Sequence, residues 1–325
     1  MNNTDRRFQT ASSGGTNLPC EASRIVAELL GGKVNSVQTI RRGLMTFKFL
    51  VKREGGQRVI VRFYPSIRAS VVNQEPDLLA RCYNVGIPVP RVIADSRTGP
   101  SSELAYIVYH MIEGSPLFEH LATFDSDQQS SLAASIALQL YNLRDIKFEG
   151  CGALKTGHIA LDSTWDMFVE HSLRDGMKAV RKHSLLDKIM TIELQRIVNR
   201  GFPTCRQSKH SLVWGDINFE NIIVDSTSRL AGLIDFESCL SGDPLATLGY
   251  CFAAHGTETF CSKVLNAWPE PLGIQELRLV FFYAVLRSLR LACYAHLPLP
   301  TGYARDPLTS IFPGLIPALK KLNDL

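Results

Sequence analysis

The chain has 325 residues, 45% of them hydrophobic and 20% charged, which is ordinary for a soluble globular protein with a core large enough for two domains or lobes. Its net charge is +4, and the positive charge is concentrated in residues 1–112, which hold 15 Lys and Arg against 8 Asp and Glu. Such a basic segment suits a lobe that handles a polyanion such as a nucleoside triphosphate. A basic solvated surface explains the same charge equally well. The eight cysteines form no C-x-x-C pair, which argues against a zinc site, and a chain of this length needs no disulfide framework.

The first third of the sequence predicts a mixed α/β lobe. Residues 1–17 are rich in Ser, Thr, Asn and Gly and are expected to form a disordered tail, so the N-terminal lobe would occupy residues 18–112. Apolar residues at helical spacing predict a helix over residues 21–30 and a helical segment within residues 70–84. The strands of a five-stranded antiparallel sheet are expected at residues 34–41, 46–52, 57–64, 91–94 and 105–111.

The remainder, residues 113–325, predicts a mostly helical lobe, which makes the fold class α+β. Apolar residues recur at helical spacing in four segments, at residues 128–142, 163–177, 186–199 and 274–295. Between them lies one compact β-rich interval, residues 211–236, which holds the most informative motif of the sequence.

Several observations argue for a cytoplasmic protein without a membrane partner. Residues 1–17 are polar and lack the apolar segment of a secretory leader. No run of 18 apolar residues occurs, and the most apolar stretch, residues 279–297, is interrupted by Arg287 and Arg290. Several cysteines lie in apolar stretches, so buried thiols are expected.

The β-rich interval predicts a hairpin with polar residues at one end. Asp216 lies in a tight segment and Asn221 follows it five residues later, just before a short strand. A turn leads to a second strand, which ends at Asp235. A hairpin of this shape can bring the three side chains together. Phosphoryl transfer from ATP requires such a set, because two oxygen ligands hold Mg²⁺ and one carboxylate orients and deprotonates the attacking hydroxyl.

The D-x-x-x-x-N segment from Asp216 to Asn221, followed by I-D-F-E at 234–237 and Gly-Asp-Pro at 242–244, resembles the aminoglycoside phosphotransferase family of small-molecule kinases. The resemblance covers about residues 20–295. It implies a bilobal protein-kinase-like fold, with a nucleotide-binding first lobe and a second lobe that holds the catalytic loop and the acceptor site. It also implies ATP and Mg²⁺ as cofactors, Asp216 as the catalytic base, and Asn221 and Asp235 as metal ligands.

The resemblance assigns a phosphate-gripping cation to the third strand, where this chain has Arg62. An exposed strand arginine is the alternative. Glu75 matches the helix glutamate that pairs with that cation. Pro76 follows directly, and because proline disfavours helical geometry in the residue before it, Glu75 is expected either to pair with Arg62 or simply to start a helix.

Two further nucleotide contacts follow from the same resemblance. Gly43 lies in a segment, residues 42–46, that resembles the family's phosphate-covering hairpin, although an ordinary hairpin turn fits a single glycine nearly as well. Residues 107–111 look like the adenine-binding hinge, in which the backbone around Tyr109 and Met111 would form the hydrogen bonds.

The sequence departs from the family pattern at two positions. The family usually has His two residues before the catalytic Asp, where this chain has Trp214, and Asp three residues after the Pro of Gly-Asp-Pro, where this chain has Thr247. Neither change removes a proposed metal ligand. The Trp214 substitution is nevertheless the clearest reason to expect altered geometry.

The predicted function is therefore transfer of the γ-phosphate of ATP to a hydroxyl of a small molecule, an aminoglycoside or other antibiotic being one candidate acceptor. Choline, sugar amines and homoserine are alternatives within the same chemistry. Residues 113–325 hold 20 basic against 23 acidic residues, an acidic bias too weak to favour a polycationic acceptor. A nucleotide-binding pseudokinase that serves as an interaction module is the alternative outside enzymes. No nucleic-acid partner is expected, because no basic–aromatic interleaving occurs, and the oligomeric state is left open.

Overall fold

The structure is a computed structural model that describes residues 17–41, 46–162, 164–199, 210–293 and 313–325. The chain divides into two compact units. The first is Met1–Asn84 with Val89–Ile112, and the second is Val85–Pro88 with Glu113–Leu325. Apart from Asn17, the predicted tail lies outside the described residues, and so does Gly43.

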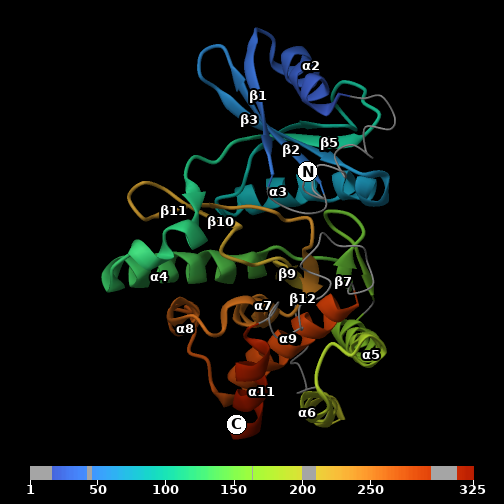
Figure 1. Ribbon diagram of the computed structural model, residues 1–325, viewed down its shortest axis with the longest axis vertical. Coiled ribbons are helices and arrows are strands. Elements are labelled where there is room, and N and C mark those ends of the chain that lie inside the picture. The colour runs from blue at the N-terminus through green and yellow to red at the C-terminus, as the bar shows by residue number, and fades with distance from the viewer. Residues whose placement is uncertain (1–16, 42–45, 163, 200–209, 294–312) are drawn as a thin grey trace. The chain divides into compact units, whose positions relative to one another are not determined.

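An antiparallel sheet forms the centre of the first unit, as predicted (Figure 1). Within the described residues it has five strands in the order β1-β2-β3-β5-β4. The strands are β1 (Val34–Ile40), β2 (Phe47–Arg53), β3 (Arg58–Tyr64), β4 (Val92–Asp95) and β5 (Ala105–His110). The helical elements are α2 (Leu18–Leu30), the 3-10 segment η2 (Ser66–Asn73) and α3 (Glu75–Asn84).

The two faces of this sheet bury different partners, because successive side chains of a strand point to opposite faces. Val59, Val61 and Phe63 of β3 pack in one core with the buried side of α2. Tyr64 lies in a second cluster with Val71 of η2 and with β5 residues. Arg62 shares the alternation of Tyr64, so the strand period itself directs Arg62 towards the η2 and α3 side of the sheet.

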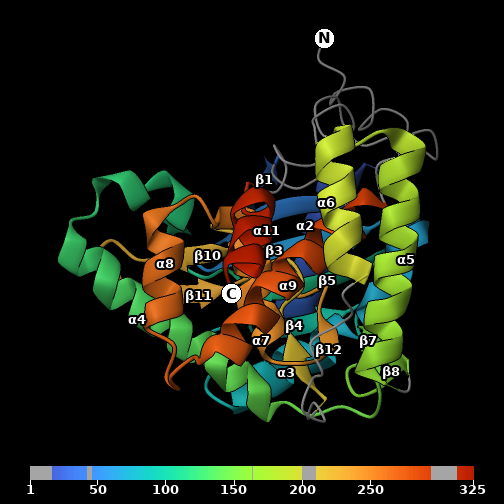
Figure 2. The same ribbon diagram turned by 90° about the horizontal axis from the view of Figure 1, so that it is seen from below.

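The second unit is mostly helical, as predicted. Its helices are α4 (Ser126–Asn142), α5 (Trp165–His183), α6 (Lys188–Asn199), α7 (Leu245–His255), α8 (Thr259–Asn266), α9 (Ile274–Ala292) and α11 (Leu315–Asp324). Helix α9 packs against α7, α5 and α11, and α5 and α6 lie side by side (Figure 2). Within the described residues, no helix combines the length and the apolar character that a membrane crossing requires.

Short strands form two small sheets in the second unit. One has the order β11-β10-β6, and the other has the order β8-β7-β12-β9. Their strands are β6 (Ser115–Pro116), β7 (Cys151–Leu154), β8 (Ala160–Asp162), β9 (Ser211–Val213), β10 (Ile222–Val224), β11 (Leu230–Leu233) and β12 (Leu240–Gly242). The loop between β9 and β10 contains Asp216, and the segment after β11 contains Asp235.

Candidate active site

The hairpin of β10 and β11 brings Asn221 and Asp235 to the same end. Ile222 is paired with Leu233 in an antiparallel register. One residue further out, the N–H of Ile234 donates to the carbonyl oxygen of Asn221 at 2.9 Å. Asp235 is the next residue along the chain, so it leaves the hairpin beside Asn221.

Asp216 is joined directly to Asn221. The Nδ2 of Asn221 donates to the backbone oxygen of Asp216 at 2.9 Å and to its carboxylate Oδ2 at 3.3 Å. The side chain of Asn218 closes the loop between them, because its Oδ1 accepts from the N–H groups of Glu220 and Asn221 at 2.8 and 3.1 Å. Asn221 is buried, whereas the side chain of Asp216 is 39% exposed and so accessible to a substrate.

Trp214 and Thr247, the two departures from the family pattern, contact each other. The backbone N–H of Trp214 donates to Oγ1 of Thr247 at 3.2 Å. The buried indole of Trp214 stacks on Phe236 with ring centroids 5.4 Å apart, and its Nε1–H donates to the carbonyl oxygen of Asp235 at 3.2 Å. Trp214 thus connects the loop that carries Asp216 to the segment that carries Asp235.

Two backbone features fix the same segment. Asp235 has a φ of +66°, a left-handed conformation that is uncommon for a residue other than glycine. Gly215 lies against the neighbouring loop so closely that a Cβ there would stand 1.8 Å from the carbonyl oxygen of Ser238. Glycine at 215 is therefore required for the two loops to approach each other.

His255 supports the loop from the end of α7. Its Nε2 accepts the backbone N–H of Phe219 at 3.1 Å, and its ring stacks on Phe219 with centroids 3.5 Å apart. Burial lowers the pKa of His255 from 6.5 to about 4, so the imidazole stays neutral and keeps an acceptor nitrogen for the loop at neutral pH.

Arg287 is a member of the site that the sequence did not assign. Its Nη2 donates to Oδ1 of Asp216 at 3.1 Å from the middle of α9. The sequence does mark Arg287 as a charged residue that interrupts an apolar helical stretch. That interruption was taken above only as an argument against a membrane span. The partner, Asp216, is too far away in the sequence for that pattern to identify it.

The donor chemistry of Asn221 and Asp235 fits a magnesium ion. Within the residues that the structure describes, no group of three or more His, Cys, Asp or Glu side chains is placed to hold a metal. Mg²⁺, however, is commonly bound by one or two protein oxygen ligands together with phosphate oxygens and water. Because Nδ2 of Asn221 donates to Asp216, Oδ1 is the amide atom that would serve as the metal ligand.

Arg62 and Glu75 form a buried ion pair in the first unit. Nη1 of Arg62 lies 3.7 Å from Oε1 of Glu75, with only 3% and 2% of the two side chains exposed. Nε of Arg62 donates to Oγ1 of Thr46 at 2.9 Å, and the hydroxyl of Tyr64 donates to Oε2 of Glu75 at 2.7 Å. Burial is the main cause that raises the pKa of Tyr64 well above its ordinary value, so it remains a donor to Glu75.

Glu75 is also the first residue of α3, so the helix start that Pro76 suggested and the contact with Arg62 occur together. A carboxylate at a helix N-terminus is favoured by the helix dipole. The arginine is therefore a buried group with fixed partners, unlike a solvated strand residue.

The two predicted hinge residues lie on β5 and just beyond it. Tyr109 is buried and paired in register with Ile60 of β3. The N–H of Met111 donates to the carbonyl oxygen of Arg58 at 3.3 Å. The structure thus places both residues beside β3, the strand that carries Arg62.

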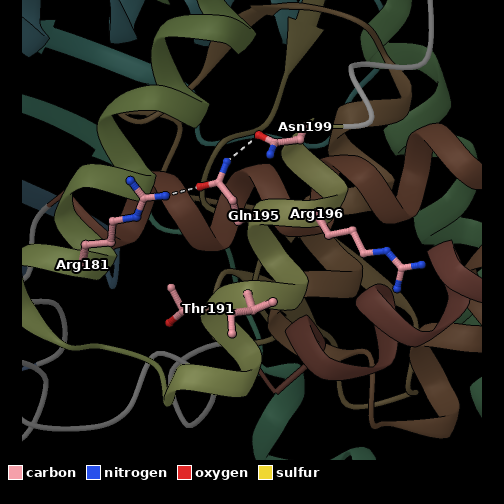
Figure 3. A pocket seen from close by; sticks show the side chains of 6 residues that line it. Arg181, Thr191, Gln195, Arg196 and Asn199 are labelled. Atoms are coloured by element: carbon pink, nitrogen blue, oxygen red, sulfur yellow. Dashed lines mark hydrogen bonds between the residues drawn. The ribbon is translucent and has the colours of Figure 1, made fainter.

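A separate open hollow of about 700 Å³ lies on the second unit (Figure 3). It is lined by Arg181 of α5 and by residues of α6, namely Thr191, Ile192, Gln195, Arg196 and Asn199. Gln195 accepts from Arg181, which joins α6 to α5, and donates to Asn199 on its own helix (Figure 3). None of the predicted site residues lines this hollow, so its position gives no support to a role in the proposed chemistry.

Comparisons with known proteins identify the family and the fold of the chain. The family model described as "Phosphotransferase enzyme family" matches residues 36–282, which is more than half of the chain. No curated protein sequence matches.

Solved structures resemble the chain over nearly its whole length. The ternary complex of a thermostable mutant of aminoglycoside phosphotransferase APH(4)-Ia with AMP-PNP and hygromycin B is 15% identical, with a TM-score of 0.64 over 94% of this chain and 97% of that one. The GDP complex of a mutant aminoglycoside 2′-phosphotransferase-IIIa is 19% identical, with a TM-score of 0.67 over 94% and 96%. The streptomycin–ATP complex of APH(2″)-IIa is 18% identical, with a TM-score of 0.61 over 95% and 97%. At such identities the likeness establishes the fold, and it confirms the predicted protein-kinase-like class.

Proposed function

The chain belongs to the phosphotransferase enzyme family, and from this premise we propose that it transfers the γ-phosphoryl group of ATP to a hydroxyl group of a small molecule. The proposal depends mainly on one observation, namely that Asp216, Asn221 and Asp235 lie together at one end of a hairpin. The Asp216 carboxylate is exposed there, and the amide of Asn221 is buried. Solved structures of the same fold hold AMP-PNP, ATP or GDP, which supports a nucleotide as the donor.

In the proposed reaction Asp216 acts as the base. An acceptor hydroxyl donates a hydrogen bond to the Asp216 carboxylate, which takes the proton as the hydroxyl oxygen attacks the γ-phosphorus. The bond between the γ-phosphorus and its bridging oxygen to the β-phosphate breaks, and ADP leaves with that oxygen. Both oxygens of Asp216 already have partners on the protein, Arg287 at Oδ1 and Asn221 at Oδ2. These contacts hold the carboxylate plane fixed, and a carboxylate retains lone pairs for one more donor.

Asn221 and Asp235 are the residues that would hold Mg²⁺, which when bound offsets the charge on the phosphate oxygens. Trp214 would keep the Asp235 segment next to the base through its hydrogen bond to the Asp235 carbonyl. In the first unit Arg62 would bind phosphate oxygens through charge-assisted hydrogen bonds, with its position fixed by Glu75 and Thr46. The backbone near Tyr109 and Met111 is the proposed adenine contact, and Gly43 the proposed phosphate-covering glycine.

The acceptor class is tested by a panel. The purified chain is incubated with Mg²⁺-ATP and aminoglycosides, macrolides, choline, sugar amines or homoserine, and ADP release is recorded together with the mass of the acceptor. We expect acceptor-dependent ADP release and one added phosphoryl group on a single acceptor class. ATP binding without turnover for any acceptor would contradict the proposal and would favour the pseudokinase alternative.

A further inference from the structure

Helix α7 contacts the loop that carries Asp216 at two points. In the first turn of the helix, Oγ1 of Thr247 accepts the backbone N–H of Trp214 at 3.2 Å. At its last residue, Nε2 of His255 accepts the backbone N–H of Phe219 at 3.1 Å. Trp214 precedes Asp216 by two residues, and Phe219 follows it by three. One helix therefore holds the loop on both sides of the proposed base.

The two contacts come from one face of α7. Thr247, Cys251 and His255 follow one another at intervals of four residues, and residues at this spacing are neighbours on a helix surface. Because a helix rises about 1.5 Å per residue, Thr247 and His255 lie about 12 Å apart along the axis. Cys251, between them, contacts Cys261 of α8, with the two sulfur atoms 4.0 Å apart. The helix thus sets the distance between the two points at which the loop is held.

Phe219 is held through its backbone and its ring. Its carbonyl oxygen accepts the N–H of Phe118 at 3.3 Å. Its ring lies flat on the His255 imidazole, with centroids 3.5 Å apart and an angle of 2° between the planes, and edge-on to Phe260 of α8 at 5.5 Å. Phe219 is 4% exposed. His255 contacts both the N–H and the ring, so its loss would release Phe219 on two sides.

The position of Phe219 bears directly on the proposed chemistry. Phe219 lies between Asp216 and Asn221, whose side chains are 3.3 Å apart from Oδ2 to Nδ2. A shift of Phe219 would change that geometry, and a displacement of about 1 Å in a catalytic arrangement can cost about 10²-fold in rate. The contact requires a neutral imidazole, because a protonated one has two donors and no acceptor.

We propose, on the basis of the function proposed above, that His255 is a positioning residue for phosphoryl transfer: by accepting the N–H of Phe219 and stacking on its ring, it holds the loop in the conformation in which Asp216 and Asn221 are correctly placed. His255 acts through the loop and not on a substrate. Its replacement should therefore lower kcat and leave the binding of ATP and of the acceptor nearly unchanged.

The test separates the acceptor nitrogen of His255 from its contribution to packing. His255→Phe keeps a ring that can stack on Phe219 and loses the acceptor. His255→Gln loses the ring and keeps an acceptor at about the distance of Nε2 from the backbone. Cys251→Ala is the matched control, because Cys251 is buried on the same face of α7 and contacts α8. For each protein, kcat, the KM values for Mg²⁺-ATP and the best acceptor of the panel, and urea unfolding are measured at neutral pH.

A second readout does not depend on turnover. Hydrogen exchange of backbone amides reports local opening of the chain. Exchange of the peptide covering residues 214–221 is therefore followed by mass spectrometry in the same four proteins. We expect this peptide to exchange faster in His255→Phe than in the unmodified chain, and to exchange at the unmodified rate in Cys251→Ala.

The expected kinetic result is a loss confined to kcat. In His255→Phe, kcat should fall by at least about tenfold, while both KM values change by less than about twofold. His255→Gln should recover at least about a third of the original kcat, because the N–H of Phe219 again has an acceptor. Cys251→Ala should lower the free energy of unfolding and keep the kcat of the unmodified chain.

Three results would overturn the inference. They are an undiminished kcat in His255→Phe, an equal loss of kcat in Cys251→Ala, and unchanged exchange of residues 214–221 in His255→Phe. If His255→Phe does not fold, His255→Asn replaces it with the same expectations, because its amide is one carbon shorter than that of Gln and does not reach the N–H of Phe219. Absence of turnover in the unmodified chain would instead refute the proposed function, and the catalytic role of His255 with it.

Discussion

Replacement of Trp214 by phenylalanine removes one hydrogen bond at the centre of the proposed site together with part of a buried ring. The variant loses the Nε1–H that donates to the Asp235 carbonyl at 3.2 Å, and it keeps an aromatic ring that can stack on Phe236. The backbone N–H that bonds to Thr247 is also retained. The change therefore tests whether the side chain at 214 holds the Asp235 segment in its left-handed conformation.

The size of the effect follows from the contact that is lost. Removal of one partner of a buried hydrogen bond costs about 1–3 kcal/mol, and because this bond is partly buried that range is an upper bound. If all of that free energy falls on the conformation in which Asp235 binds metal, the apparent affinity for Mg²⁺ weakens roughly 5- to 150-fold. The smaller ring adds a packing loss, which lowers the free energy of unfolding without acting on the metal specifically.

The assay is the initial rate as a function of Mg²⁺ concentration at saturating ATP, with urea unfolding measured in parallel. We expect a higher Mg²⁺ concentration for half-maximal activity in Trp214→Phe and partial recovery in Trp214→His, in which an imidazole can again donate. A folded Trp214→Phe protein with the Mg²⁺ dependence of the unmodified chain would refute the positioning role of the indole.

Two further predictions concern the phosphate grip and the loop support. Arg62→Ala should weaken Mg²⁺-ATP binding in calorimetry by about tenfold or more, because a charged hydrogen bond is worth about 1.5–3 kcal/mol. The control Lys52→Ala, on the exposed side of β2, should leave the affinity unchanged. Equal affinities in the two variants would show that Arg62 serves the fold alone. For His255, whose pKa falls from 6.5 to about 4 in the folded protein, the unfolded chain binds a proton at a higher pH than the folded chain does. The stability that neutral His255 contributes above pH 6.5 is therefore lost as the pH falls from 6.5 towards 4, by up to about 3 kcal/mol. Over this window the free energy of unfolding, measured in urea, should fall more steeply in the unmodified chain than in His255→Asn. The same pH dependence in both proteins would contradict the assigned role of His255.

The elements that sequence predicts best are those with one buried side. The strands of the first unit show the alternation of a sheet, and the sheet is present. Helix α7 was not predicted, because residues 246–253 are buried all round and carry no helical stripe. Helix α4 begins two residues before its predicted start, although the capping box between Asp125 and Gln128 marks that start in the sequence.

The site divides in the same way. The proximity of Asp216, Asn221 and Asp235 was accessible to prediction, because one hairpin and the loop just before it contain all three residues. Arg287 was not, because its contact with Asp216 joins positions 71 residues apart and depends on how α9 packs. The sequence likewise gave no reason to expect that Trp214 and Thr247 would contact each other, or that the Trp214 indole would donate to Asp235.

The central claim is that Asp216 takes the proton from an acceptor hydroxyl, and Asp216→Asn tests it most directly. The substitution keeps the size of the side chain and removes its charge, while Asn221 and Asp235 remain. With the best acceptor of the panel saturating, we expect ATP binding close to that of the unmodified chain and turnover lower by at least about 10²-fold, the usual scale for loss of general-base catalysis. Residual activity is expected, because positioning supplies much of the rate in phosphoryl transfer. Full turnover in Asp216→Asn would show that Asp216 is not the base and would contradict the account.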